Sequence, residues 1–322
     1  PEATSAWKWT PKSLEALTAL DGNHSIAIGG PTTVIRRASI NLVRATTTVS
    51  TSLHGASATH IIRSFSEEAL VQPNVQFIRA GKRQIPCALI LPRDIKPGTK
   101  LPVLMDPYGG PHAQRVVDSY TAHCTSQWFA DQGFAVLVVD GRGTPGLGTE
   151  WERSVYLDLA TAVLEDQVDA LHAVAADHPE LDLDRVAIRG WSFGGYLAAL
   201  AVLRRPDVFH SAIAGAPVTD WHYYNSIYTE RYMGLPQENP KGYEASSVIK
   251  SASNLNGKVL ILHGTMDDNV HPINSIAFIN KLQEFNKPYD FQIYPGSDHG
   301  VRFPNQIHSK QMKIWSFIQS NL

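Results

Sequence analysis

From about residue 75 onward, the chain alternates between short, continuous apolar runs and longer segments with a helical period. The clearest apolar run, residues 135–139, reads Ala-Val-Leu-Val-Val without a polar interruption. Runs of this kind suit strands covered on both faces, which is typical of a largely parallel sheet. The predicted strands are 75–78, 87–91, 103–105, 134–140, 185–188, 211–214, 259–262 and 291–294.

The segments between these runs carry the spacing of amphipathic helices. Leu164, Val168, Leu171 and Ala175 recur at spacings of four, three and four, which places them on one buried stripe. The last segment, around residues 315–318, has a similar pattern. Strands that alternate with helices predict an α/β fold with a mostly parallel central sheet. No unit is repeated in this region, so we expect a single α/β domain.

The first 71 residues differ from the rest of the chain. Ser and Thr occupy 19 of the first 70 positions. We therefore expect a β-rich extension over residues 1–71 and the α/β domain over residues 72–322. The extension is either a loosely packed β segment or a propeller remnant, because one blade has four short strands in about 40–45 residues and a closed propeller needs at least about four blades. Its β-prone runs are 25–28, 33–35, 40–43 and 60–63.

Composition and charge exclude several kinds of partner. The chain has 322 residues, of which 43% are hydrophobic, enough for a sizeable core. Its formal net charge is −2 and its pI is about 6.7. With no long basic run, this balance speaks against nucleic acid or an anionic membrane surface as partners. No stretch approaches the ~18 apolar residues of a membrane span.

The cysteines and the first residue say little about location. Cys87 and Cys124 fit neither a CxxC pair, nor a metal-ligand spacing, nor a disulfide framework. Their sparse use suits both a cytoplasmic and a secreted protein. The chain begins at Pro1, without an initiator methionine or a signal peptide, which indicates a processed chain or a piece of a longer one.

The most informative motif is Gly-Trp-Ser-Phe-Gly at residues 190–194. It stands between a predicted strand and a helix-forming run, the context that a nucleophile elbow requires. Glycines at both ends allow the backbones of strand and helix to approach closely. The turn would expose the hydroxyl of Ser192 above the sheet and place the Phe193 N–H where an oxyanion develops. The motif therefore predicts a serine hydrolase.

A serine hydroxyl needs a base to take its proton and an acid to orient that base. In an α/β-hydrolase, the acid and then a histidine follow the serine, on loops after later strands. The strand that ends at residue 262 leads to Asp267 and Asp268, and the strand that ends at residue 294 leads to His299. We predict His299 as the base. Spacing alone leaves open which of the two aspartates is the acid.

An oxyanion hole needs a second donor from an early strand. The predicted strand 103–105 leads into Tyr108 and a Gly-Gly-Pro sequence at residues 109–111. This loop is either a plain Gly-Pro turn or the source of a backbone N–H or of the Tyr108 hydroxyl for the oxyanion.

Together these segments resemble the prolyl oligopeptidase family of serine peptidases, in its dipeptidyl peptidase IV branch. The resemblance covers roughly residues 72–322. The most discriminating segment is the aromatic-rich run at 221–236. The others are the extended elbow at 190–196 and the segments 108–111, 140–144, 263–270 and 298–300.

The resemblance implies a role for each matching residue. Ser192 would be the nucleophile, Asp267 the acid and His299 the base, and Tyr108 would donate its hydroxyl to the oxyanion beside the Phe193 N–H. Asn269 would bind a substrate carbonyl. A pocket of aromatic faces suits proline, a flat apolar ring without an N–H. The residues implied for that pocket are Val218, Trp221, Tyr224, Tyr228 and Val270.

We therefore expect an enzyme that cleaves peptides after proline-like residues through an acyl-enzyme, with no metal or organic cofactor. A homodimer is expected by resemblance only. Relatives carry a full propeller whose paired glutamates hold the free amino terminus of the substrate. Glu67 and Glu68 lie where we expect a linker, so the resemblance does not extend to dipeptide release. The alternatives are a carboxylesterase for short acyl esters, because the propeller that selects peptides is missing here, and a binding module on an inactive hydrolase fold.

Overall fold

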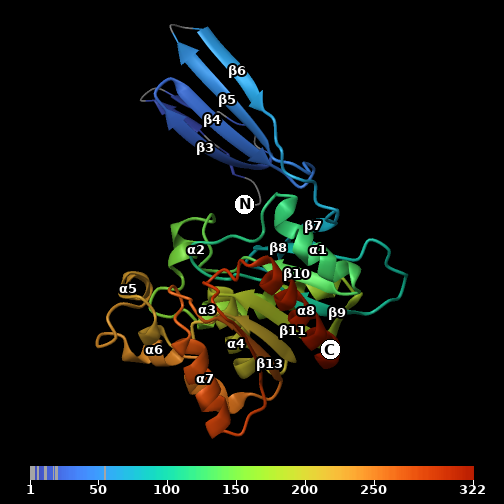
Figure 1. Ribbon diagram of the computed structural model, residues 1–322, viewed down its shortest axis with the longest axis vertical. Coiled ribbons are helices and arrows are strands. Elements are labelled where there is room, and N and C mark those ends of the chain that lie inside the picture. Colours follow the sequence, from blue (N-terminus) through green and yellow to red (C-terminus); the bar gives the residue numbers. More distant parts are fainter. Residues whose placement is uncertain (1–3, 6, 11–12, 17, 19–20, 54–55) are drawn as a thin grey trace.

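The computed structural model describes residues 4–5, 7–10, 13–16, 18, 21–53 and 56–322. These residues form a two-stranded hairpin, a four-stranded antiparallel sheet and an eight-stranded sheet with helices on both faces (Figure 1). The two smaller sheets precede residue 75, where the larger one begins.

The extension is built from one hairpin and one antiparallel meander. The expected strands at 25–28, 33–35 and 60–63 overlap strands of the meander, which extend up to four residues beyond the expected ends. The Ser/Thr-rich run at 46–52 also forms a strand, because β-branched threonines suit a half-exposed sheet. The strands are β1 (Trp7–Thr10), β2 (Ser13–Ala16), β3 (Asn23–Gly29), β4 (Thr32–Ala38), β5 (Thr46–Leu53) and β6 (Ala56–Ile62).

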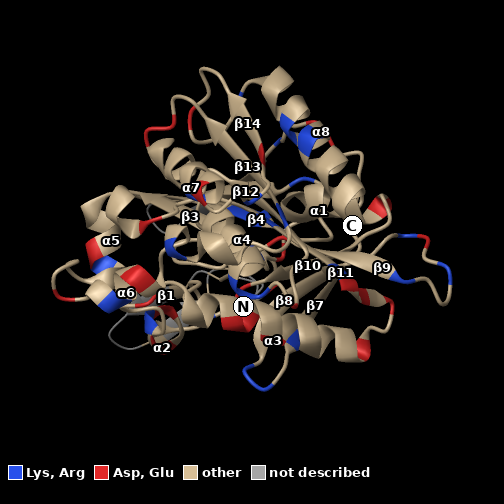
Figure 2. Ribbon diagram, turned by 90° about the horizontal axis from the view of Figure 1, so that it is seen from below, with Lys and Arg blue, Asp and Glu red and all other residues tan. Residues whose placement is uncertain are grey.

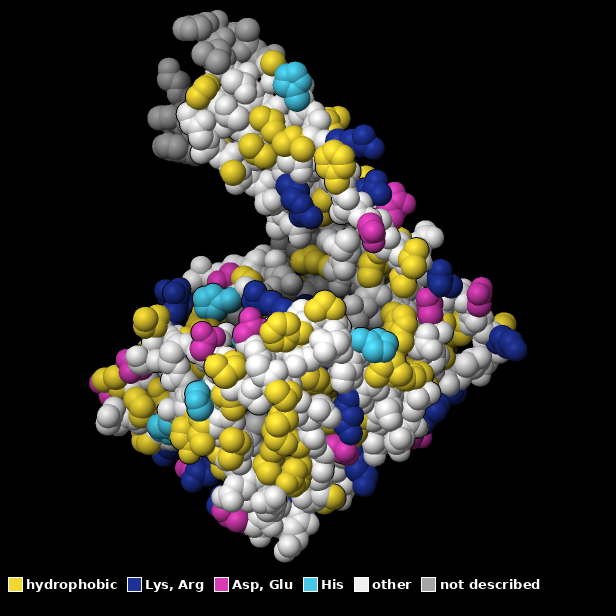
Figure 3. Space-filling view, in the orientation of Figure 1, with side chains coloured by type: hydrophobic (Ala, Val, Ile, Leu, Met, Phe, Trp, Pro, Cys, Tyr) yellow, Lys and Arg dark blue, Asp and Glu magenta, His cyan; other side chains and the backbone are white. Residues whose placement is uncertain are grey.

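The expected strand at 40–43 is wrong. The residues after β4 form a turn, in which the Leu42 N–H donates to the Ser39 carbonyl at 3.0 Å. This turn contacts the rest of the molecule: the Asp118 carboxylate accepts the Ser39 hydroxyl at 3.1 Å and the Ile40 N–H at 2.6 Å. The Tyr120 N–H donates to the Ser39 carbonyl at 3.2 Å. The four-stranded sheet otherwise stands away from the body (Figure 3).

The large sheet has the strand order β14-β13-β12-β11-β9-β10-β8-β7. Neighbours from β14 to β10 are parallel, whereas β8 pairs antiparallel with β10 and β7. The expected mostly parallel sheet of an α/β-hydrolase is therefore confirmed. Its strands are β7 (Val75–Ala80), β8 (Ile85–Ile90), β9 (Leu101–Met105), β10 (Ala135–Val139), β11 (Leu181–Trp191), β12 (Ser211–Gly215), β13 (Lys258–Gly264) and β14 (Asp290–Tyr294).

Both faces of the central strands are buried, which explains their apolar sequences. In β10, Leu137 and Val139 belong to the apolar cluster that includes side chains of α3, α4 and α7, whereas Val136 and Val138 belong to the cluster that includes side chains of α1 and α8. Successive residues of a strand point to opposite faces, so a strand between two helical layers is apolar throughout. These helices are α1 (Cys124–Asp131), α3 (Thr161–Asp177), α4 (Phe193–Arg204), α7 (Ile273–Glu284) and α8 (Pro304–Asn321).

Shorter helices lie in the connections. Lys and Arg residues are interspersed with Asp and Glu residues along these and the longer elements (Figure 2). Among the described residues, no helix has the length and hydropathy needed to cross a bilayer. The short elements are α2 (Thr149–Arg153), α5 (Ser226–Met233), α6 (Pro240–Ala245), and the 3₁₀ helices η1 (Thr121–His123), η2 (Trp221–Tyr223) and η3 (Ile249–Asn254).

Candidate active site

Ser192 lies at the turn between β11 and α4, with φ of 60° and ψ of −118°. Such a conformation is strained for any residue with a side chain. The surrounding glycines make the turn possible: a Cβ on Gly190 would lie 2.2 Å from the Gly194 backbone, and a Cβ on Gly195 would lie 2.2 Å from the Gly215 carbonyl oxygen. The structure thus has the strand–turn–helix geometry that the motif predicts.

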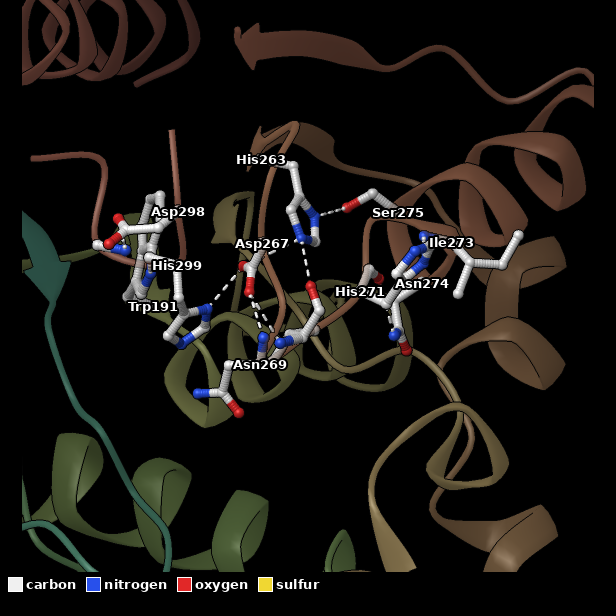
Figure 4. Close-up of polar contacts among 12 residues, drawn as sticks. Trp191, His263, Asp267, Asn269, His271, Ile273, Asn274, Ser275, Asp298 and His299 are labelled. Carbon is white, nitrogen blue, oxygen red and sulfur yellow. Dashed lines mark hydrogen bonds and ion pairs between the residues drawn. The ribbon is translucent and has the colours of Figure 1, made fainter. Parts of the chain in front are cut away.

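Asp267 and His299 meet at the carboxyl ends of the neighbouring strands β13 and β14 (Figure 4). The Asp267 Oδ2 accepts from the His299 Nδ1 at 2.7 Å. Its Oδ1 accepts the backbone N–H groups of Asn269 at 3.0 Å and Val270 at 2.9 Å. Because an ionised carboxylate only accepts, Nδ1 of His299 is the donor in this contact, so a neutral His299 has its lone pair on Nε2. Asp268, the other candidate acid, is exposed.

His263 is a second histidine on the same carboxylate, and the sequence analysis did not identify it as part of the site. Its Nε2 donates to the Val270 carbonyl at 2.8 Å and lies 3.3 Å from the Asp267 Oδ2, and its Nδ1 lies 2.7 Å from the Ser275 hydroxyl. Burial alone would raise the pKa of Asp267, but hydrogen bonds from His263 and His299 hold that pKa well below its usual value. Asp267 therefore stays ionised.

Trp191 connects His299 to the elbow. The indole N–H of Trp191 donates to the His299 carbonyl at 2.7 Å, and Trp191 directly precedes Ser192 in the chain. This bond holds the loop that carries His299 against the turn that carries Ser192.

Tyr108 approaches Ser192 from the loop after β9. Burial raises the pKa of Tyr108 to about 12, and the nearby Ser192 side chain acts on that pKa in the opposite direction. The phenol is therefore protonated at neutral pH and can donate. The Tyr108 ring lies 5.9 Å from the Phe193 ring, and the Phe193 N–H belongs to the first turn of α4, where N–H groups lack intrahelical partners.

The predicted pocket residues come together beside this loop. Trp221 is buried and stacks on Tyr228, with ring centroids 5.9 Å apart and planes 10° from parallel. Tyr224 stands edge-on to both rings, at 6.0 and 5.3 Å. Its hydroxyl donates to the Asn269 Oδ1 at 2.8 Å. Val218 and Val270 are buried in the same apolar cluster.

Two further tyrosines belong to this aromatic group. Tyr232 lies one helical turn after Tyr228, with ring centroids 4.9 Å apart, and Tyr196 lies 5.2 Å from Trp221. Tyr228 and Tyr232 both lie on α5, and their four-residue spacing is a signal that identifies Tyr232 from sequence. Tyr232 also borders a cavity of about 520 Å³, whose other lining residues are Thr149, Glu152, Arg153, Tyr156 and Arg231.

Within the part of the chain that the structure describes, no three His, Cys, Asp or Glu side chains are grouped so that they could hold a metal ion.

Comparisons with known proteins identify the family of this chain. The model of the prolyl oligopeptidase family matches residues 120–322. The chain is 38% identical to mouse dipeptidyl peptidase 8 over 239 residues, which are 73% of this chain and 27% of that protein. The human dipeptidyl peptidase 8 matches with the same identity and coverage. This chain therefore spans about a quarter of the length of these relatives.

The fold extends the similarity to the whole chain. The crystal structure of Porphyromonas gingivalis dipeptidyl peptidase 4 covers 100% of this chain with a TM-score of 0.88 and 30% sequence identity, and 47% of that structure is matched. With a family model that matches more than half of its residues and a fold shared along its whole length, the chain belongs to the prolyl oligopeptidase family of serine peptidases.

Proposed function

We propose that this chain is the catalytic part of a dipeptidyl peptidase-like enzyme that cleaves peptides after proline-like residues. Ser192 is the nucleophile, His299 the base and Asp267 the acid that orients it. The observation that carries the proposal is the bond of 2.7 Å between the His299 Nδ1 and the buried, ionised Asp267, which leaves the His299 Nε2 free to accept a proton.

The proposed reaction proceeds in two halves. The His299 Nε2 takes the proton of the Ser192 hydroxyl as its oxygen forms a bond to the scissile carbonyl carbon. The Tyr108 hydroxyl and the Phe193 N–H donate to the resulting oxyanion. When the C–N bond breaks, His299 gives its proton to the leaving amine. A water molecule, deprotonated by the same histidine, then hydrolyses the acyl-enzyme and restores Ser192.

The aromatic cluster supports proline as the residue before the scissile bond. Trp221 and Tyr228 offer apolar ring faces, and a proline ring has no N–H that would need an acceptor there. Asn269 stands at the rim, held by the Tyr224 hydroxyl, and is the proposed ligand of a substrate carbonyl. Val218 and Val270 complete the proposed pocket.

We further propose the division into an extension (1–71) and a hydrolase domain (72–322). Four antiparallel strands over residues 23–62 have the size of one propeller blade. Glu68 lies 3.6 Å from Arg44, and both side chains are exposed, which supports a linker role rather than a substrate contact. The relatives named above are dipeptidyl peptidases. Their names therefore do not favour the carboxylesterase alternative. The homodimer stays a prediction.

The proposal is tested by turnover and by active-site labelling. We expect wild-type protein to hydrolyse a Gly-Pro anilide and to react with a fluorophosphonate probe, and Ser192→Ala to do neither. Ser253→Ala, at an exposed serine in η3, should behave as wild type. Labelling of the Ser192→Ala variant would contradict the assignment. An N-blocked Gly-Pro anilide, cleaved as fast as the free one, would show that no group here holds the substrate's amino terminus.

A further inference from the structure

His112 connects the loop that carries Tyr108 to the helix that carries the pocket tyrosines. Its Nε2 lies 2.7 Å from the Tyr232 hydroxyl, across 120 residues of sequence. Its ring lies 5.5 Å from the Tyr228 ring and stands edge-on to the Tyr232 ring at 5.8 Å. One exposed side chain thus contacts two successive turns of α5.

The backbone of His112 is in a conformation that favours glycine, with φ of 77°. This conformation is strained for a residue with a side chain, and such a residue persists there where its surroundings hold it. Glycine would adopt this conformation without the steric cost. We therefore infer that the contacts of His112 with Tyr228 and Tyr232 offset this strain.

The loop between Tyr108 and His112 is held tightly on its other side. A Cβ on Gly109 would lie 2.4 Å from the Leu197 side chain, and a Cβ on Gly110 would lie 2.3 Å from the Phe193 ring. The loop therefore packs directly on α4, the helix that follows Ser192. With α4 on its inner side and His112 on α5, the loop has little freedom to move Tyr108.

The same contact bears on the pocket. Tyr228 is packed between Trp221 and His112, with ring centroids at 5.9 and 5.5 Å respectively. A displacement of His112 would therefore shift the Tyr228 ring directly, and it would shift the Tyr108 hydroxyl through the loop.

We propose that His112 is a positioning residue that fixes the oxyanion donor Tyr108 relative to the pocket for the residue before the scissile bond. This inference rests on the proposed function. His112 acts through Tyr108, Tyr228 and Tyr232 rather than by contact with the substrate. Its hydrogen bond to the Tyr232 hydroxyl links the loop that carries Tyr108 to α5.

The test is a double-mutant cycle on positions 112 and 232, with kcat and KM for a Gly-Pro anilide and rates per active site titrated with a phosphonate. His112→Gly keeps a backbone suited to the positive φ and removes only the ring. We expect it to lower kcat/KM about tenfold, chiefly through kcat, because small misplacements of catalytic groups are costly. Tyr232→Phe should lower it severalfold. The double variant should be no worse than His112→Gly alone, because both changes remove the same bond.

Two further variants separate positioning from stability. His112→Gln, whose amide can reach the Tyr232 hydroxyl, should recover most of the rate. Tyr289→Phe removes a tyrosine hydroxyl bonded to Gln283 at the start of β14 and should leave kcat and KM unchanged. Wild-type kcat and KM in His112→Gly, or strictly additive effects at the two positions, would overturn the inference. An inert wild type would instead overturn the proposed function and this inference with it.

Discussion

Replacing Asp267 by asparagine should remove most of the activity while keeping the fold. The two side chains have the same shape, and the asparagine oxygen can still accept the N–H groups of Asn269 and Val270, now 3.0 and 2.9 Å from Oδ1. The new NH₂ group then faces the His299 Nδ1, where the carboxylate oxygen lies at 2.7 Å. Two donors cannot share this contact. His299 would change tautomer and place its proton on Nε2, the atom that must accept the proton of Ser192.

The magnitude follows from which contacts are lost. A wrong tautomer in such a catalytic group lowers kcat by about 10⁴-fold, which corresponds to a barrier about 5 kcal/mol higher. Unfolding should be affected far less, since both backbone N–H groups keep an acceptor. Asp267→Ala would instead remove the acceptor of both N–H groups, at about 1–3 kcal/mol for the donor of the buried Val270. The asparagine variant therefore separates chemistry from stability.

The assay is kcat for a Gly-Pro anilide, together with thermal unfolding followed by circular dichroism. Asp268→Asn is the matched control, because Asp268 is the exposed neighbour of Asp267, and it should stay within about twofold of wild type. More than a tenth of wild-type kcat in Asp267→Asn, or an equal loss in Asp268→Asn, would refute the tautomer argument.

Two more predictions concern residues at the carboxyl ends of the interior strands β10 and β11. Burial raises the pKa of Asp140 from 3.8 to about 6, so the folded state holds this proton more tightly than the unfolded state does. The free energy of unfolding should therefore fall by up to about 3 kcal/mol as the pH rises from 4 to 6, and then stay constant. In Asp140→Asn, the free energy of unfolding, measured by chemical denaturation at pH 4–8, should depend less on pH than in wild type. The same pH dependence in both proteins would contradict this. Trp191→Phe removes the 2.7 Å bond to the His299 carbonyl and should lower kcat about 2–10-fold. Trp315→Phe, on α8, is the control that should keep full kcat.

Local sequence signals predict the parts of this molecule that are set by local physics. The elbow needs small residues at fixed positions within six residues, and the buried strands need continuous apolar runs, so both could be read from the chain. The turn at 40–43 could not, because its branched residues suit a strand, and only its contact with Asp118, far along the chain, makes it an attachment point.

Side chains that meet across the fold were harder to foresee. Asp267 and Asp268 are adjacent and chemically identical, and only the backbone path after β13 turns one of them toward His299. The partner of His112 comes from a helix 120 residues away, so no local pattern predicts that contact. The partners of His263 lie only 4 to 12 residues away, but a histidine at the end of a strand carries no signal of which neighbour it binds.

The strained turn at Ser192 matters for anyone who would engineer this protein. Its φ of 60° and ψ of −118° cost on the order of 1–3 kcal/mol for a residue with a side chain, and glycine would carry much less of that strain. A mutant library ranked by melting temperature alone would therefore tend to enrich Ser192→Gly, which lacks the hydroxyl. Directed evolution toward heat resistance would need a turnover screen in every round to keep the nucleophile.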